Sequence, residues 1–180
     1  LSGAAIFDHQ GKLALLDYVV DCDSEWRTRS ARVNGSVGLE PLVFEIQAMP
    51  GGRWLLNGVE QPKSSGCIDL DLGFTPATNL IAIRRLDPRQ GVKLPAPAAY
   101  YLEFSLELGI VEQTYRRTAK DGLDYTSPAY DYDETLNVSE VGLSPNIPAS
   151  GAARWLPPEL PQHLGKAGLC NEAEALPDFC

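Results

Sequence analysis

The chain has 180 residues, 44% of them hydrophobic and 22% charged, which is ordinary for a single globular domain. Its formal net charge of −9, from 24 acidic and 15 basic residues, argues against nucleic acid and anionic membranes as partners. The sequence has no secretory signal pattern, and no apolar run approaches the roughly 20 residues of a transmembrane helix.

Alternation of apolar and polar residues with a period of two predicts β-strands through most of the chain. In the first third, the predicted strands are 12–22, 26–33 and 39–49. Turn signals of the Asn-Gly and Gly-Gly type follow at 34–35, 51–52 and 57–58. Within the second strand, the alternation places Trp26 on one face and both Arg27 and Arg29 on the other.

The segment GCIDLDLGFTPATNLIAIRRL, residues 66–86, predicts a β-hairpin with acids on one strand and arginines on the next. On a strand, Asp69 and Asp71 would share a face with Cα atoms roughly 6.5–7 Å apart, a spacing compatible with an inverting glycosidase. Arg84 and Arg85 would keep both carboxylates ionised, which does not suit a general acid. We therefore favour an ion network, structural or ligand-binding, over a catalytic pair.

The second half of the chain continues the strand pattern. Its predicted strands are 100–109, 110–118 and 130–138, and an Asp-Gly turn signal stands at 121–122. A helix competes with the strand in the window 97–108, and we favour the strand. Because no strand–helix alternation repeats, the prediction is a mainly β fold with little helix, a single-domain antiparallel β-roll or half-open barrel. We place this domain at residues 1–143.

Residues 144–180 differ in kind, because they contain six of the chain's fourteen prolines and show no alternation. We predict that this proline-rich segment is a poorly ordered C-terminal tail. None of the four cysteines stands in a C-x-x-C pair, and Cys22 and Cys67 lie in apolar stretches typical of buried thiols. This cysteine usage indicates a reducing cytoplasm.

Few residues are available for catalysis. The two histidines, His9 and His163, lie near the N-terminus and in the predicted tail, which argues against a histidine-based triad or metal site. The sequence also lacks both glycine-rich phosphate-binding motifs. We therefore expect no metal, no cofactor and no enzymatic activity.

Aromatic and arginine side chains suggest a binding surface instead. Trp26 and Trp54 each stand beside an arginine, and sugars stack on flat aromatic rings while guanidinium groups bind planar acceptors. Each tryptophan could equally fill the core. The same ambiguity holds for Tyr115.

Three segments, SEWRTRSARVNG, RWLLNG and above all GCIDLDLGFTPATNLIAIRRL, resemble the bacterial "putative glycolipid-binding" family, formerly described as a domain of unknown function. The resemblance covers roughly residues 3–143. It implies an open β-roll or half-barrel, loosely similar to the bacterial lipoprotein carriers, and brings no established catalytic residues. The family's signature residues fall on Trp26, Arg27, Arg29, Trp54, Asp69, Asp71, Asn79, Arg84 and Arg85.

Three functions follow as hypotheses. The leading one is a lipid- or glycolipid-binding protein, with an apolar tail in a groove of the β-roll and a polar head held at a charged rim. We add Tyr115 to the nine signature residues as a candidate ligand contact. The alternatives are a hydrolase of a glycan or lipid ester that uses Asp69 and Asp71, and a structural or protein-interaction domain. The oligomeric state does not follow from the sequence.

Overall fold

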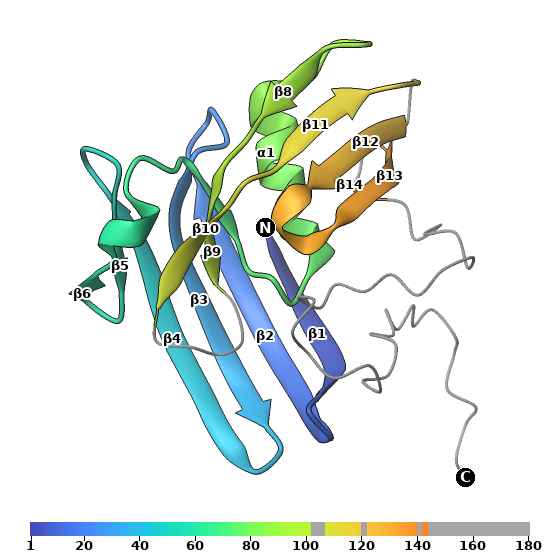
Figure 1. Ribbon diagram of the computed structural model, residues 1–180. Coiled ribbons are helices and arrows are strands. Elements are labelled where there is room, and N and C mark those ends of the chain that lie inside the picture. Colours follow the sequence, from blue (N-terminus) through green and yellow to red (C-terminus); the bar gives the residue numbers. More distant parts are fainter. Residues whose placement is uncertain (102–106, 120–121, 140–141, 144–180) are drawn as a thin grey trace, which may run out of the picture.

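The computed structural model describes residues 1–101, 107–119, 122–139 and 142–143 (Figure 1). These residues form three β-sheets and one short α-helix, α1 (Asn79–Leu86), and the sheets do not close into a barrel. The predicted mainly antiparallel β fold is therefore confirmed. Within the described residues, no helix is both long and apolar enough to cross a membrane.

The largest sheet is an antiparallel meander of six strands that neighbour one another in chain order. These strands are β1 (Ser2–His9), β2 (Lys12–Cys22), β3 (Thr28–Val37), β4 (Glu40–Met49), β5 (Arg53–Leu56) and β6 (Val59–Glu60). In β2 the alternation is complete, because Leu16, Tyr18 and Val20 are buried while Leu15 and Val19 are exposed. The predicted strands 12–22 and 39–49 are confirmed.

Glycine plays two different roles in this sheet. The predicted turn at 34–35 is wrong, because both residues lie inside β3 and Gly35 pairs with Leu16 of β2. A Cβ on Gly35 would lie 2.0 Å from the carbonyl oxygen of Leu15, so glycine is needed there for close strand approach. The predicted Asn57-Gly58 turn is confirmed, with φ angles of 50° and 78° that are typical of a type I′ hairpin.

The predicted hairpin at 66–86 is only half correct. Its first half is β7 (Asp69–Asp71), but the second half is α1 rather than a strand. Two short 3₁₀ helices, η1 (Pro62–Ser64) and η2 (Pro76–Thr78), precede the two elements. The Thr75 hydroxyl accepts the backbone N–H of Ala77, and Pro76 occupies the first helical position. Thr-Pro is therefore a helix start in this chain, not the centre of a hairpin turn.

The other two sheets are smaller. The three-stranded sheet has the order β10 (Leu108–Val111), β9 (Ala98–Tyr101) and β7, and β7 pairs with β9 in parallel. The five-stranded sheet has the order β14 (Gly142–Leu143), β13 (Tyr132–Ser139), β12 (Gly122–Ser127), β11 (Thr114–Arg117) and β8 (Lys93–Pro95). A third 3₁₀ helix, η3 (Pro128–Tyr130), connects β12 to β13. Figure 1 shows α1 between this sheet and the six-stranded sheet.

The predicted single strand 100–109 is wrong, because the chain reverses direction within it. Leu108 of β10 pairs with Tyr101 of β9, so these two side chains share a face. Strict alternation along one strand would have placed Leu108 with Tyr100 instead. Residues 102–106 lie outside the described residues, as do Asp121 of the predicted turn and the predicted tail 144–180. The predicted strand 110–118 is divided between β10 and β11.

The core consists of two main clusters that meet at α1. Ile81 packs into the cluster between the six-stranded and three-stranded sheets, where Phe44 stacks on Tyr101 with ring centroids 4.1 Å apart. On another side of the helix, Ala82 and Ile83 pack against the five-stranded sheet. The helix therefore belongs to both clusters. Cys67 is a buried free thiol, as predicted, whereas Cys22 is only half-buried.

Candidate functional site

A cleft of about 440 Å³ lies where three segments distant in sequence converge. They are the β2–β3 turn, the residue before β7, and the last turn of α1. Its lining residues are Ser24, Glu25, Trp26, Arg27, Ile68, Arg84 and Arg85. Four of the predicted site residues, Trp26, Arg27, Arg84 and Arg85, thus lie together, whereas their role in binding stays a prediction.

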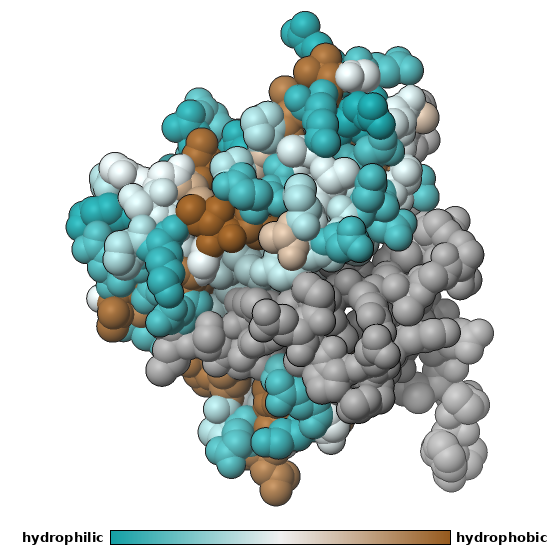
Figure 2. Space-filling model, in the orientation of Figure 1, coloured by the Kyte–Doolittle hydropathy of each residue, from teal (hydrophilic) through white to brown (hydrophobic). Residues whose placement is uncertain are grey.

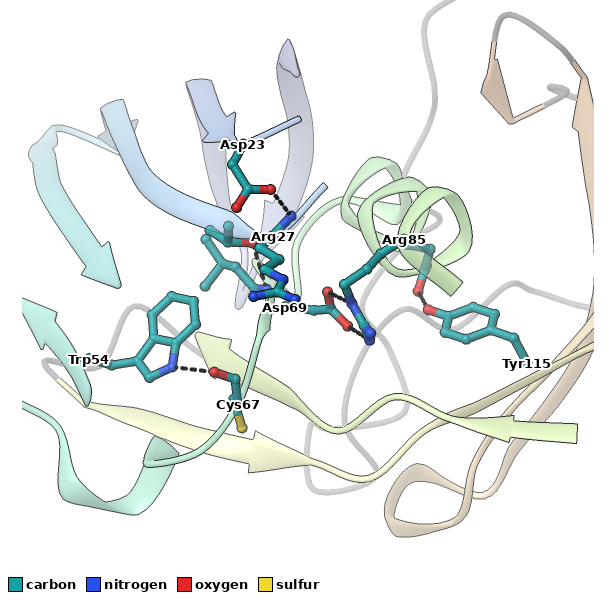
Figure 3. Close-up of polar contacts among 10 residues, drawn as sticks. Asp23, Arg27, Trp54, Cys67, Asp69, Arg85 and Tyr115 are labelled. Carbon is teal, nitrogen blue, oxygen red and sulfur yellow. Dashed lines mark hydrogen bonds and ion pairs between the residues drawn. The ribbon is translucent and has the colours of Figure 1, made fainter. Parts of the chain in front are cut away.

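Asp23 organises the β2–β3 turn on one side of the cleft. One of its carboxylate oxygens, Oδ1, accepts the backbone N–H groups of Glu25 and Arg27, both at 2.9 Å (Figure 3). These hydrogen bonds, first of all the one from Arg27, hold the pKa of Asp23 below its usual range. The turn therefore fixes the backbone on both sides of Trp26.

Trp26 has a left-handed backbone conformation, with φ at 62°, and the residue is 38% exposed. The expectation that it belongs to a strand is wrong, because β3 begins only at Thr28. A bulky residue in this conformation costs on the order of 1–3 kcal/mol. Its indole ring lies under the guanidinium of Arg84, whose central carbon is 5.9 Å from the ring centroid.

Asp69 supports the opposite wall of the cleft by fixing Arg85 (Figure 3). The guanidinium donates from Nε to Oδ1 at 2.8 Å and from Nη2 to Oδ2 at 2.7 Å. Asp69 is 1% exposed and the Arg85 side chain is 18% exposed, so the pair is largely shielded from water. The hydrogen bonds that Arg85 donates to Asp69 raise the pKa of Arg85. The predicted pairing of acid and arginine is present, but it joins a strand to a helix.

Asp71 has a different environment, although it lies only two residues away. It takes its hydrogen bonds from the backbone N–H of Gly73, at 2.8 Å, and from the Thr78 hydroxyl, rather than from the predicted arginine. Burial raises the pKa of Asp71 to about 6, because desolvation outweighs both hydrogen bonds. Asp71 does not line the cleft, and its contacts stabilise the turn between β7 and α1.

Asn79 and Tyr115 form a second buried link to the helix. The hydroxyl of Tyr115 on β11 donates to Oδ1 of Asn79 at the start of α1, and both residues are almost completely buried. Burial holds the pKa of Tyr115 well above its usual range. This contact connects α1 to the five-stranded sheet, whereas the ligand role of both residues stays a prediction.

The last two predicted residues lie away from the cleft. Trp54 is 1% exposed and its indole Nε1–H donates to the carbonyl oxygen of Cys67 at 3.1 Å, so it fills the core (Figure 3). Arg29 is exposed on β3 and is not among the lining residues. Sequence reasoning missed Ser24, Glu25 and Ile68. The Asp23-Ser24 pair before Trp26 was the available signal, because Asp and Ser favour such turns.

The lining combines one indole face, three guanidinium groups and one carboxylate. Arg27 forms an exposed ion pair with Glu25 at 2.9 Å, a contact that contributes little to stability. Aromatic faces and fork-shaped donors together suit a polar ring that carries oxygen acceptors. The arrangement is therefore suited to bind a sugar-like group.

The chain is similar to known proteins in sequence and in fold. The family model described as "Putative glycolipid-binding" matches residues 1–150. The fold is similar to the crystal structure of a DUF1089 family protein from Pseudomonas aeruginosa, with a TM-score of 0.67 and 25% sequence identity. The similarity covers 79% of this chain and 86% of that one. No curated protein matches the chain.

Proposed function

Because the chain belongs to the "Putative glycolipid-binding" family, we propose that it binds a glycolipid or a related amphiphilic lipid. The polar head lies in the cleft beside Trp26, and the apolar tail lies in a groove of the β-roll. The observation that carries this proposal is the cleft itself, in which an exposed indole lies among three arginines. An indole face can stack on a sugar ring, and guanidinium groups can donate hydrogen bonds to its oxygens.

The head-binding part of the proposal has the stronger support. The Asp23 turn fixes Trp26, and the Asp69 carboxylate fixes Arg85, so two of the proposed contacts are held in place before a ligand arrives. Prepositioned side chains lose less conformational entropy on binding, which favours affinity. Arg84 and Arg27 complete the rim from the helix and the turn.

The tail-binding part rests on the family description and on sheets that remain open. Ile68 is the apolar residue of the lining and is 42% exposed, so it offers a first contact for the tail next to the head group. Figure 2 shows brown, apolar patches between hydrophilic areas on the face of the molecule that is in view. We propose that affinity increases with tail length, by about 0.8 kcal/mol for each buried CH₂.

The alternative is a hydrolase of a glycan or lipid ester that uses Asp69 and Asp71. One observation favours it, because the raised pKa of Asp71, about 6, is typical of a general acid. Against it, both oxygens of Asp69 are bound to Arg85, and neither carboxylate lines the cleft. We therefore propose a binding role without turnover.

The test uses octyl β-glucoside, below its micelle concentration, as a probe with one sugar and one tail. We expect binding by calorimetry and a raised melting temperature, both lost in Trp26→Ala. Arg32→Gln, a change on β3 in an exposed ion pair with Glu45, serves as the control and keeps both effects. If neither octyl glucoside nor lipid extracted from the purified protein binds, the proposal is wrong; release of glucose from the probe would instead favour the hydrolase.

A further inference from the structure

The cleft differs in charge from the rest of the molecule. The whole chain carries a formal charge of −9, yet among the described residues the lining holds Arg27, Arg84 and Arg85 beside one acid, Glu25. Counting also Asp69, which is bound to Arg85, and Asp23 of the turn with its neighbour Arg29, four arginines stand against three acids. The arginine-rich cleft attracts anions, whereas the acidic remainder of the surface repels them. An anion is therefore expected to bind at the cleft rather than elsewhere on the molecule.

Arg85 and Arg27 also retain hydrogen-bonding capacity. A guanidinium has five N–H donors, and the bidentate pair with Asp69 uses one on Nε and one on Nη2 of Arg85. Three donors on this fixed group therefore remain for another acceptor. Arg27 is bound to Glu25 only through an exposed contact, which an anion can replace at low cost.

Trp26 supplies the second, independent observation. The residue is held in a left-handed conformation that glycine would adopt without strain, and its ring still remains partly exposed. Strain of this kind persists where the surrounding structure over-determines it, as it often does at binding sites. Here the Asp23 turn maintains the conformation and places the indole in the wall of the positive cleft.

From this geometry we infer that the cleft selects an acidic sugar, with a carboxylate on the ring bound by Arg85 and Arg27 and the ring itself against Trp26. The inference rests on the proposed function and narrows it to anionic glycolipids. A planar carboxylate fits the fork of a guanidinium with two parallel hydrogen bonds, which a neutral hydroxymethyl group cannot form.

The experiment compares octyl β-glucuronide with octyl β-glucoside, which share the tail and the ring and differ only in a carboxylate. We expect the glucuronide to bind about tenfold more tightly at low salt, measured by calorimetry with the full chain. The ratio of the two affinities should fall toward one in Arg27→Gln and in high salt. The matched control Arg32→Gln should keep the ratio of the natural chain. Arg27 is exposed, so its removal leaves the fold intact.

The outcomes separate the inference from the proposed function. Equal affinity for both glycosides overturns the inference and leaves the proposed glycolipid binding intact. If neither glycoside binds, the inference and the proposed function are both wrong. Free glucuronate and inorganic phosphate serve as competitors. If phosphate displaces the glucuronide as well as free glucuronate does, the cleft is a general anion site and the sugar-specific inference is wrong.

Discussion

Replacing Asp69 by leucine tests the buried ion pair beneath the cleft. The substitution leaves the guanidinium of Arg85, whose side chain is 18% exposed, without the carboxylate that binds it at 2.7 and 2.8 Å. Breaking a buried pair costs about 3–5 kcal/mol, and some access of water to Arg85 favours the lower end. We expect the free energy of unfolding in urea to fall by about 3 kcal/mol, which lowers the melting temperature by roughly 6–12 °C.

Two further variants make the result interpretable. The double variant Asp69→Leu, Arg85→Met removes both charges and should unfold within about 1 kcal/mol of the natural chain, because no unpaired charge remains. Glu45→Gln breaks the exposed pair with Arg32, at 3.6 Å, and should cost less than about 1 kcal/mol. A loss of under 1 kcal/mol for Asp69→Leu alone, or no recovery in the double variant, would refute the reasoning.

Three other predictions concern single residues of the site. The pKa of Asp71 is raised by burial to about 6 from 3.8, so its stabilising contribution is complete below pH 4 and is lost as pH rises through 6. The free energy of unfolding of the natural chain should therefore fall by about 3 kcal/mol between those pH values, and Asp71→Asn should remove this decrease. Urea unfolding of both proteins across that range measures the difference, and parallel pH curves would contradict the prediction. Trp26→Gly should keep or raise the melting temperature, by relieving about 1 kcal/mol of backbone strain, while it abolishes binding of octyl glucoside; a marked loss of stability would show that Trp26 is structural. Tyr115→Phe should cost about 1–3 kcal/mol in the same unfolding assay, because the buried Asn79 loses its donor, and an unchanged midpoint would count against that hydrogen bond.

The sequence predicted the strands best where one face of a strand is buried and the other is exposed. Lys12–Cys22 is such a case, and its predicted bounds equal those of β2. Prediction failed where two signals compete. Thr75 and Pro76 occur in turns and at helix starts alike, and only the hydrogen bond from Ala77 to Thr75 distinguishes the two. The sequence pattern therefore predicts a strand where the structure has the short helix α1.

In the site, too, some features could be predicted from the sequence and others could not. The pairing of Asp69 with Arg85 followed from opposite charges within one segment, and it survives although the second element is a helix. Burial could not be predicted in the same way. Trp26 and Trp54 both stand beside an arginine in sequence, yet one lines the cleft and the other fills the core. Only the packing of segments distant in the chain separates the two, and local pattern does not contain that information.

The position of α1 has a consequence for the whole molecule. Eight residues contribute Ile81 to one core cluster and Ile83 to the other, and the same helix ends in the two arginines of the cleft. A ligand that restrains those arginines would also restrain the helix, and with it the packing on both sides. Occupancy of the cleft should therefore slow amide hydrogen exchange in the six-stranded meander and in the five-stranded sheet alike, because a single bound molecule would stiffen two layers through the helix packed against both.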